Sequence, residues 1–282
     1  MDSTAQKLFG SEIGSTTVTT IASRARGAAK YGITDWTDTQ AEEVFRALQE
    51  RAQREGFDLE SLCLTSKSAV VGTIRRSQAL DQLIRDFAAA HPSPVILSLG
   101  IGLCNAASRL RDIDARWFGV DKKEVLDTRA ELIPEDTVHC IPGDLAEPHT
   151  WLPHIPADAP TLVVAEGVLM YLQPESVPPL LDALRAHFSE APALELAADL
   201  YDTLMMKRKT DHEIKERTGA SYSFGAEGPE GLASQAEGWE ALGAVDTMSP
   251  ISTEMRLAVP ALKRLCRGRL PYSVMRIAAT RA

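Results

Sequence analysis

The stretch from residue 95 to residue 121 constrains the fold of this chain more than any other. The apolar run Val-Ile-Leu-Ser-Leu breaks into Gly100-Ile-Gly102, and a second apolar run ends in Asp121, 21 positions after Gly100. Paired glycines let the backbone turn and approach a ligand closely, and an acid about 20 residues further on accepts hydrogen bonds from ribose hydroxyls. This spacing predicts a nucleoside cofactor at the edge of a parallel α/β sheet.

Position 105 decides which cofactor is favoured. A dinucleotide fingerprint has a third glycine three positions after the second, near the pyrophosphate. Here that residue is Asn105, and no glycine occurs between Gly102 and Gly119. S-adenosylmethionine has no phosphates and needs no such cradle. The sequence therefore favours S-adenosylmethionine, and NAD is the alternative.

Composition narrows the partners and the compartment. The chain has 282 residues and a formal net charge of −9, which argues against a nucleic-acid partner. No run reaches the roughly 20 apolar residues of a membrane span, and the first residues do not form a signal peptide. The four cysteines form no Cys-x-x-Cys pair, so no metal site is expected. We expect a cytoplasmic protein without a membrane partner.

Hydrophobic patterning predicts seven strands separated by helices. Strands are expected at 94–99, 116–120, 136–141, 160–165, 193–199, 243–248 and 272–280. Helices are expected at 37–56, 73–90 and 230–242, among others. This alternation is typical of a doubly wound, mostly parallel α/β sheet.

Acids follow two further strands. Asp144 comes after the third strand, where it could accept a hydrogen bond from the adenine amino group with Leu145 against the ring. Pro-Gly-Asp also favours a plain turn. Glu166 ends the fourth strand, and ligands bind at the carboxyl ends of parallel strands, although a helix cap is the alternative role. Tyr171 either packs as an aromatic side chain or faces the methyl acceptor.

Three arginines are candidates for the methionine end of the cofactor. Arg75 and Arg76 lie in the helix before the first strand, and Arg24 lies near the start of the chain. A guanidinium can grip a carboxylate with two hydrogen bonds. The alternative for each is a place on a solvated helix face.

Three segments together carry a family resemblance. Residues 95–110, residues 119–129 and the run Glu166-Gly-Val-Leu-Met-Tyr-Leu resemble the leucine carboxyl methyltransferase family, and within it a bacterial branch of polyketide O-methyltransferases. The resemblance covers about residues 70–190. It implies a class I S-adenosylmethionine-dependent methyltransferase fold whose terminal strand runs antiparallel. We expect a methyltransferase domain at 73–282 with a lid insertion at about 200–230, and a helical extension at 1–72.

The resemblance assigns roles residue by residue. Arg76, five positions before Asp81, matches the arginine that grips the cofactor carboxylate, and Arg75 is the alternative. The other cofactor-binding residues implied are Gly100, Asp121, Asp144, Leu145, Glu166 and Arg24.

One segment departs from the family pattern. The family reads Gly-Leu-Asp-Thr-Arg, whereas this chain has Gly102-Leu-Cys-Asn-Ala106. The change removes polar groups near the methionine end of the cofactor, which Arg109 could partly replace. It is the basis of an alternative function, in which a methyltransferase-like protein binds a ligand or partner without transferring a methyl group.

The sequence thus predicts an S-adenosylmethionine-dependent O-methyltransferase. Its acceptor would be a carboxyl or hydroxyl group of a small molecule such as a polyketide-like secondary metabolite. A carboxylate needs no general base, whereas an alcohol or phenol needs one within hydrogen-bond reach. No His or Asp has the pattern of such a base, which favours a carboxylate or an acidic phenol. Tyr171 and Tyr201 are the candidates for orienting the acceptor.

Overall fold

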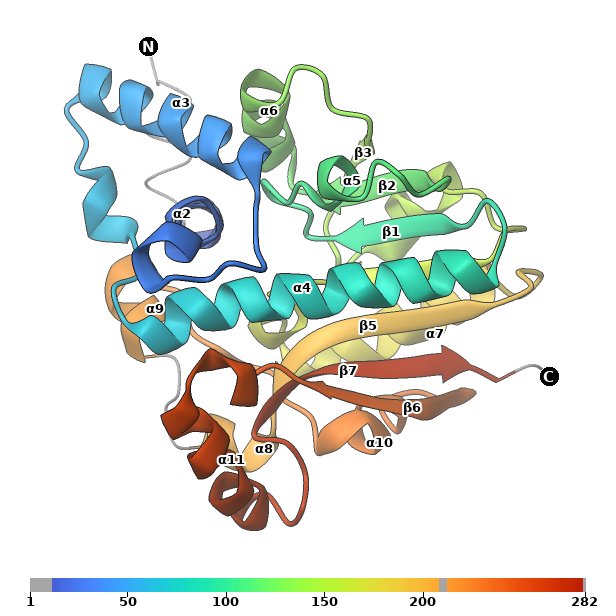
Figure 1. The fold of residues 1–282 in the computed structure, drawn as a ribbon. Helices are drawn as coiled ribbons and strands as arrows, with labels where there is room; N and C mark the ends of the chain where they lie inside the picture. Colours follow the sequence, from blue (N-terminus) through green and yellow to red (C-terminus); the bar gives the residue numbers. More distant parts are fainter. Residues whose placement is uncertain (1–11, 208–211, 281–282) are drawn as a thin grey trace.

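A computed structural model describes residues 12–207 and 212–280 of the chain. Seven strands form one sheet in the order β3-β2-β1-β4-β5-β7-β6 (Figure 1). The strands are β1 (Val95–Leu99), β2 (Arg116–Asp121), β3 (His139–Pro142), β4 (Thr161–Ala165), β5 (Leu194–Tyr201), β6 (Trp239–Asp246) and β7 (Tyr272–Ala279). The first five run parallel, and β7 lies antiparallel between β5 and β6. The predicted fold class is confirmed, including the antiparallel last strand.

Helices cover both faces of the sheet. They are α2 (Glu12–Tyr31), α3 (Thr39–Glu55), α4 (Lys67–Ala90), α5 (Ala106–Arg109), α6 (Lys123–Leu132), α7 (Val177–His187), α8 (Thr203–Met206), α9 (His212–Thr218), α10 (Gly228–Ala233) and α11 (Thr253–Leu265). Buried leucines of α4, such as Leu80, pack against Ile96 and Leu162 on one face. Leu181 of α7 belongs to the larger core on the other face, with Val163 of β4.

The N-terminal helices have a core of their own. Val18 and Ile21 of α2 pack with Val44, Phe45 and Leu48 of α3, all of them buried. Helix α4 then runs from this part of the molecule across the sheet, as Figure 1 shows. It begins at the cap residue Ser66, whose side chain accepts a hydrogen bond from the backbone N–H of Ala69. Because α4 is continuous through residue 72, the predicted boundary there falls inside a helix, and the two-part division stays a prediction.

One predicted helix is wrong. The expected helix at 230–242 is only the short α10, and β6 already begins at Trp239. Gly238, with a φ of 74°, turns the chain before the strand begins. Leu232, Trp239 and Leu242 fit a helical spacing, but Leu242 lies on the exposed side of β6, next to a register shift between Ala241 and Gly243, so its apolar side chain is not a core signal.

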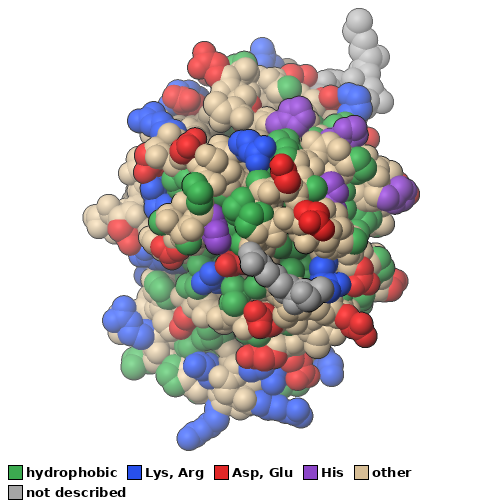
Figure 2. All heavy atoms as spheres, turned by 90° about the vertical axis from the view of Figure 1, so that its right-hand side faces the viewer, with side chains coloured by type: hydrophobic (Ala, Val, Ile, Leu, Met, Phe, Trp, Pro, Cys, Tyr) green, Lys and Arg blue, Asp and Glu red, His purple; other side chains and the backbone are tan. Residues whose placement is uncertain are grey.

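The face of the molecule at the amino ends of the parallel strands carries mixed charge. Figure 2 shows acidic and basic side chains interspersed there, with Lys and Arg gathered at its lower end. No helix within residues 12–207 and 212–280 combines the length and apolar character needed to cross a bilayer.

Candidate active site

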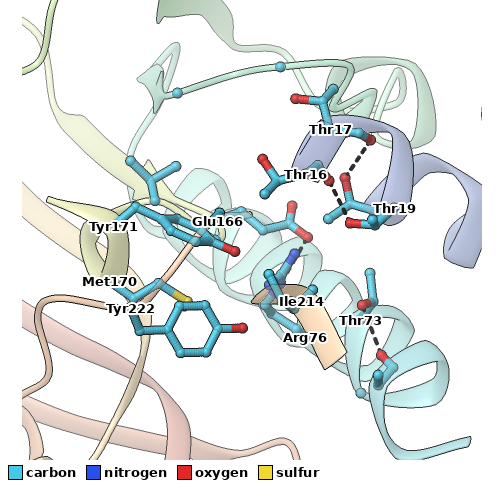
Figure 3. Close-up of a pocket in the computed structure, with 18 of the residues that line it drawn as sticks. Thr16, Thr17, Thr19, Thr73, Arg76, Glu166, Met170, Tyr171, Ile214 and Tyr222 are labelled. Atoms are coloured by element: carbon cyan, nitrogen blue, oxygen red, sulfur yellow. Dashed lines mark hydrogen bonds and ion pairs between the residues drawn. The ribbon is translucent and has the colours of Figure 1, made fainter. Parts of the chain in front are cut away.

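One cavity of about 1120 Å³ lies at the carboxyl ends of the parallel strands. The strand order reverses between β1 and β4, and open α/β sheets bind ligands at such a switch point. Helices α2, α4 and α9 close the cavity on the side away from the sheet (Figure 3). Ligand pockets typically measure about 300–1,000 Å³, so this one has room for a cofactor and a second molecule together.

The glycine loop after β1 forms one end of the cavity. Gly100 and Gly102 have φ values of 58° and 50°, in the left-handed region that favours glycine. A Cβ atom on Gly100 would lie 2.6 Å from a methyl group of Val168, so that position has no room for a side chain. The loop therefore presents bare backbone to the cavity.

Asp121, at the end of β2, lies beside this loop. Its carboxylate accepts hydrogen bonds from the backbone N–H groups of Gly102, at 2.7 Å, and of Lys122, at 2.8 Å. Burial raises the pKa of Asp121, and these two donors partly offset that effect. Each carboxylate oxygen can accept a further hydrogen bond, so the side chain is still able to bind a ribose hydroxyl in the cavity that it lines.

Asp144 and Leu145 line the same cavity after β3. Asp144 is exposed at the rim, and its carboxylate accepts a hydrogen bond from the backbone N–H of Ala146 at 2.9 Å. Leu145 is buried. Asp144 therefore makes the turn that its sequence suggested and also lies where a ligand could reach it.

The centre of the cavity holds a buried ion cluster. The guanidinium of Arg76 donates to Glu166, with Nε 3.3 Å from Oε1, and to Asp199, with Nη1 3.2 Å from Oδ2. Ser77 donates to Glu166 at 2.6 Å. Burial alone would raise the pKa of Glu166, but the positive charges of Arg76, Arg24 and Arg109 outweigh it and lower the pKa to about 2.

The arginine candidates lie in different places. Arg24 is buried at the cavity, where its Nη2 donates to the backbone carbonyl of Leu103 at 3.1 Å. Its Nε lies 3.9 Å from Oδ2 of the buried Asp38, so the guanidinium is held between the glycine loop and the cap of α3. Arg75 instead forms an ion pair with Asp35 and does not line the cavity. The structure thus brings Arg76 and Arg24, but not Arg75, to the candidate site.

Hydrogen bonds from neighbouring side chains hold the unusual loop at 103–106 in place. Arg129 donates to the backbone carbonyls of Gly102, at 3.0 Å, and Cys104, at 2.6 Å. The buried Asn105 donates a hydrogen bond to Asp38 of the α3 cap. Arg109 does not line the cavity, because it binds Asp81 through two hydrogen bonds of 2.7 and 2.8 Å. It therefore adds positive potential at Glu166 without a direct place in the cavity.

Four tyrosines form a continuous aromatic wall. The ring of Tyr222 lies 5.2 Å from that of Tyr171 and 5.4 Å from that of Tyr201, and Tyr201 lies 4.6 Å from Tyr272. Figure 3 shows the Tyr171 and Tyr222 side chains beside Glu166 and Arg76. Burial raises the pKa of Tyr171, Tyr222 and Tyr272. These phenols stay protonated and can donate hydrogen bonds, but they are poor bases.

The wall contributed by α2 and α4 is less polar than its composition suggests. Thr19 donates its hydroxyl to the carbonyl of Thr16 at 2.7 Å, and Thr20 donates to that of Thr17 at 2.9 Å. Thr73 likewise donates to Ala69 at 2.9 Å (Figure 3). Because the hydroxyl protons of Thr19, Thr20 and Thr73 are bonded within their own helices, these three side chains offer methyl groups and acceptor oxygens rather than donors.

Helix α9 is fastened over the cavity by Glu213. Its carboxylate accepts hydrogen bonds from the backbone N–H of Thr65, at 2.7 Å, and the hydroxyl of Ser66, at 2.5 Å. Partial burial alone would raise the pKa of Glu213, but these hydrogen bonds outweigh it and lower the pKa to about 2. Arg217 adds a hydrogen bond to the carbonyl of Ser61. The expected lid thus contacts the start of α4.

Sequence reasoning missed Asp199, Tyr222 and Tyr272. Asp199 lies near the carboxyl end of β5, so the rule that selected Glu166 would have selected it too. Tyr272 begins β7, and its role depends on that strand running antiparallel. Tyr222 lies in irregular chain between α9 and α10, where no periodic signal exists.

Comparison with known proteins agrees with this geometry. The family model for leucine carboxyl methyltransferase matches residues 20–185, more than half of the chain. The tetracenomycin polyketide synthesis O-methyltransferase TcmP of Streptomyces glaucescens is 28% identical over 205 residues, which cover 71% of each chain. A shorter match, 28% identical over 125 residues, joins 41% of this chain to 42% of the S-adenosyl-L-methionine-dependent methyltransferase dpfgK of Gibberella zeae.

A solved structure shares the fold. The crystal structure of a candidate methyltransferase from Thermobifida fusca YX superposes with a TM-score of 0.58 at 21% identity and covers 94% of both chains. Fold, relatives and site together define an S-adenosylmethionine-dependent O-methyltransferase of class I. Within that class, the chain belongs to the leucine carboxyl methyltransferase family.

Proposed function

We propose that this enzyme methylates an already ionised oxygen, a carboxylate or an acidic phenol, on a small aromatic acceptor such as a polyketide. One observation carries the proposal: the titratable groups around Glu166 are not poised to accept a proton. Glu166 has a pKa of about 2, and the pKa values of Tyr171 and Tyr222 are raised by burial. A neutral alcohol would need a general base within hydrogen-bond reach. An ionised acceptor needs none.

The cofactor would occupy the strand-end half of the cavity. Asp121 would bind the ribose hydroxyls beside the open backbone of Gly100, and Asp144 and Leu145 would contact the adenine. Arg76 and Arg24 would hold the methionine carboxylate, and Glu166 would accept hydrogen bonds from its ammonium group. The bound cofactor supplies an electrophilic methyl group on a sulfonium. Both guanidinium groups are buried and line this cavity, which supports the placement.

The acceptor would occupy the half between the tyrosine wall and α2, α4 and α9. A phenol hydroxyl can donate a hydrogen bond, so Tyr171 and Tyr201 can orient an anionic oxygen. In the transfer, the acceptor oxygen forms a bond to the methyl carbon while the carbon–sulfur bond breaks, and its electron pair stays on sulfur. No proton moves. Alignment and exclusion of water can lower such a barrier by about 7–11 kcal/mol in favourable cases.

The polyketide part of the proposal is supported by the relative TcmP, whose name gives its role in tetracenomycin polyketide synthesis. The aromatic side chains of the acceptor half suit a ring system. We also propose a cytoplasmic location, which is consistent with the four free cysteines.

Product chemistry tests the proposal directly. Purified enzyme is incubated with S-adenosylmethionine and matched aromatic acceptors that carry either a carboxyl or a phenol group. A methyl ester is hydrolysed by mild base and a methyl ether is not, so alkali treatment before mass spectrometry separates the products. We expect transfer that does not rise with pH for acceptors ionised at neutral pH. Transfer to a neutral alcohol at neutral pH would contradict the proposal.

A further inference from the structure

Asp199 is a buried carboxylate beside the cavity that accepts three hydrogen bonds. It is fully buried, on β5, with no role in the transfer described above. Its Oδ1 accepts a hydrogen bond from the backbone N–H of Gly167 at 2.5 Å. Its Oδ2 accepts from Nη1 of Arg76 at 3.2 Å and from the hydroxyl of Tyr272 at 2.5 Å. One side chain therefore joins α4, the end of β4 and the start of β7.

The contacts with Gly167 and Arg76 are coupled. Gly167 has a φ of 65°, and a Cβ atom there would lie 3.1 Å from Nη1 of Arg76. The guanidinium thus lies flat against this glycine, whose own N–H is held by Asp199. Gly167 also follows Glu166 directly, so the same hydrogen bond fixes the backbone that presents Glu166 to Arg76.

Two effects of Asp199 on cofactor binding are conceivable, with opposite signs. A carboxylate on Arg76 could compete with the cofactor carboxylate, in which case its removal would tighten binding. Alternatively, Asp199 holds the planar guanidinium of Arg76 in one orientation, which keeps it able to donate two hydrogen bonds to a carboxylate. The geometry favours the second effect, because Asp199 contacts Arg76 from the sheet side and orients its neighbour Gly167 as well.

We propose that Asp199 is a positioning residue that fixes Arg76 and the Glu166–Gly167 backbone for binding the methionine end of the cofactor. This inference rests on the proposed cofactor role of Arg76. It implies that the exact position of the Asp199 carboxylate matters for cofactor binding, in addition to its charge.

Titration calorimetry with S-adenosylhomocysteine provides the test. We expect Asp199→Asn to weaken binding by about tenfold or more, the scale of a hydrogen bond to a charged group. Asp199→Glu keeps the charge but displaces it, and should also weaken binding. The matched control is Asp202→Asn. Asp202 is equally buried and pairs with Arg269 at 2.7 Å, but it accepts no hydrogen bond from Arg76 or Gly167, so its variant should lose stability and keep its affinity.

A double-mutant cycle with Arg76→Lys tests whether Asp199 affects cofactor binding through Arg76. If Asp199 acts through Arg76, Asp199→Asn should add little to the loss already caused by Arg76→Lys. Additive losses, or a folded Asp199→Asn variant with unchanged or tighter binding, would overturn the inference. Unchanged binding by Arg76→Lys alone would instead reject the cofactor role of Arg76, and the inference with it. If Asp199→Asn does not fold, Asp199→Glu decides between the outcomes in the same way.

Discussion

Asp121 accepts a 2.7 Å hydrogen bond from the backbone N–H of Gly102, so the end of β2 and the loop after β1 form a single unit. The same carboxylate shapes the loop and faces the cavity. Gly102 and Asp121, 19 positions apart in the sequence, are therefore directly bonded, and both line the cavity.

Asp121→Asn should weaken S-adenosylhomocysteine binding by about tenfold or more, because hydrogen bonds to a charged group contribute about 1.5–3 kcal/mol. Titration calorimetry measures the change. Asp127→Asn is the control, because Asp127 is an exposed acid on α6 that pairs with Lys123. Equal affinity of the Asp121 variant and the control would remove Asp121 from the site.

Arg76→Gln should reduce cofactor affinity by about tenfold or more, and Arg75→Gln by less than about twofold. The two residues are adjacent on α4, but only Arg76 lines the cavity, while Arg75 pairs with exposed Asp35. The pair of variants is measured side by side by thermal shift with added S-adenosylmethionine. A larger loss of affinity in Arg75→Gln would show that the arginine of the family pattern corresponds to Arg75 and not to Arg76.

Gly100→Ala should abolish cofactor binding, while Gly32→Ala should leave it intact. Both glycines have positive φ, so either substitution costs about 1–2 kcal/mol of backbone strain. Only Gly100 would also bring a Cβ within 2.6 Å of Val168, whereas nothing lies within 4 Å at Gly32. Binding is followed by calorimetry and folding by urea denaturation. Retained affinity in Gly100→Ala would show that the loop can adapt.

Acid should destabilise the protein partly through Glu166. Its folded pKa of about 2 lies below the value of about 4.3 in an unfolded chain. Between these values the unfolded state binds more protons, so stability present above about pH 5 is lost as the pH falls. Urea unfolding from about pH 6 to pH 3 should show a shallower decline in Glu166→Gln, by up to about 1.4 kcal/mol per pH unit. Parallel curves would mean that Glu166 is not held ionised.

Glu213→Gln should raise the KM for the methyl acceptor several-fold, by about 3–10 times, and leave cofactor affinity unchanged. The carboxylate fastens α9 to Thr65 and Ser66 at the acceptor side of the cavity, and an amide cannot accept the same set of hydrogen bonds. Steady-state kinetics with both substrates varied gives the two constants. Glu216→Gln, exposed on the same helix, is the control. An equal rise in the KM values for the acceptor and the cofactor would show that the substitution disturbs the whole cavity and not only its acceptor side.

The cofactor half of the site could be predicted because its residues follow local patterns. Gly100, Asp121 and Glu166 each lie at or just after the carboxyl end of a parallel strand, and strand ends are recognisable in one sequence. Their order along the chain already indicates that they meet at one edge. The roles given to these residues remain predictions that the variants above test.

The acceptor half could not be predicted in the same way. Thr16, Ile214, Tyr222 and Met255 line one cavity but come from four separate segments. Which helix faces meet there depends on how α2, α9 and α11 pack, and that is decided by long-range contacts rather than by periodicity. Tyr222 also lies outside any regular element, where sequence patterns carry no information on side-chain direction.

The antiparallel placement of β7 has a consequence for how the site is assembled. Because β7 runs against its neighbours, its first residue, Tyr272, lies at the edge where the parallel strands end and donates there to Asp199. A sheet in which β7 has not yet paired has the glycine loop and Asp121, but it lacks this tyrosine and a partner for the far side of β5. Completion of the pocket therefore depends on the long-range pairing of β7 with β5, in which the partners Tyr201 and Tyr272 lie 71 positions apart.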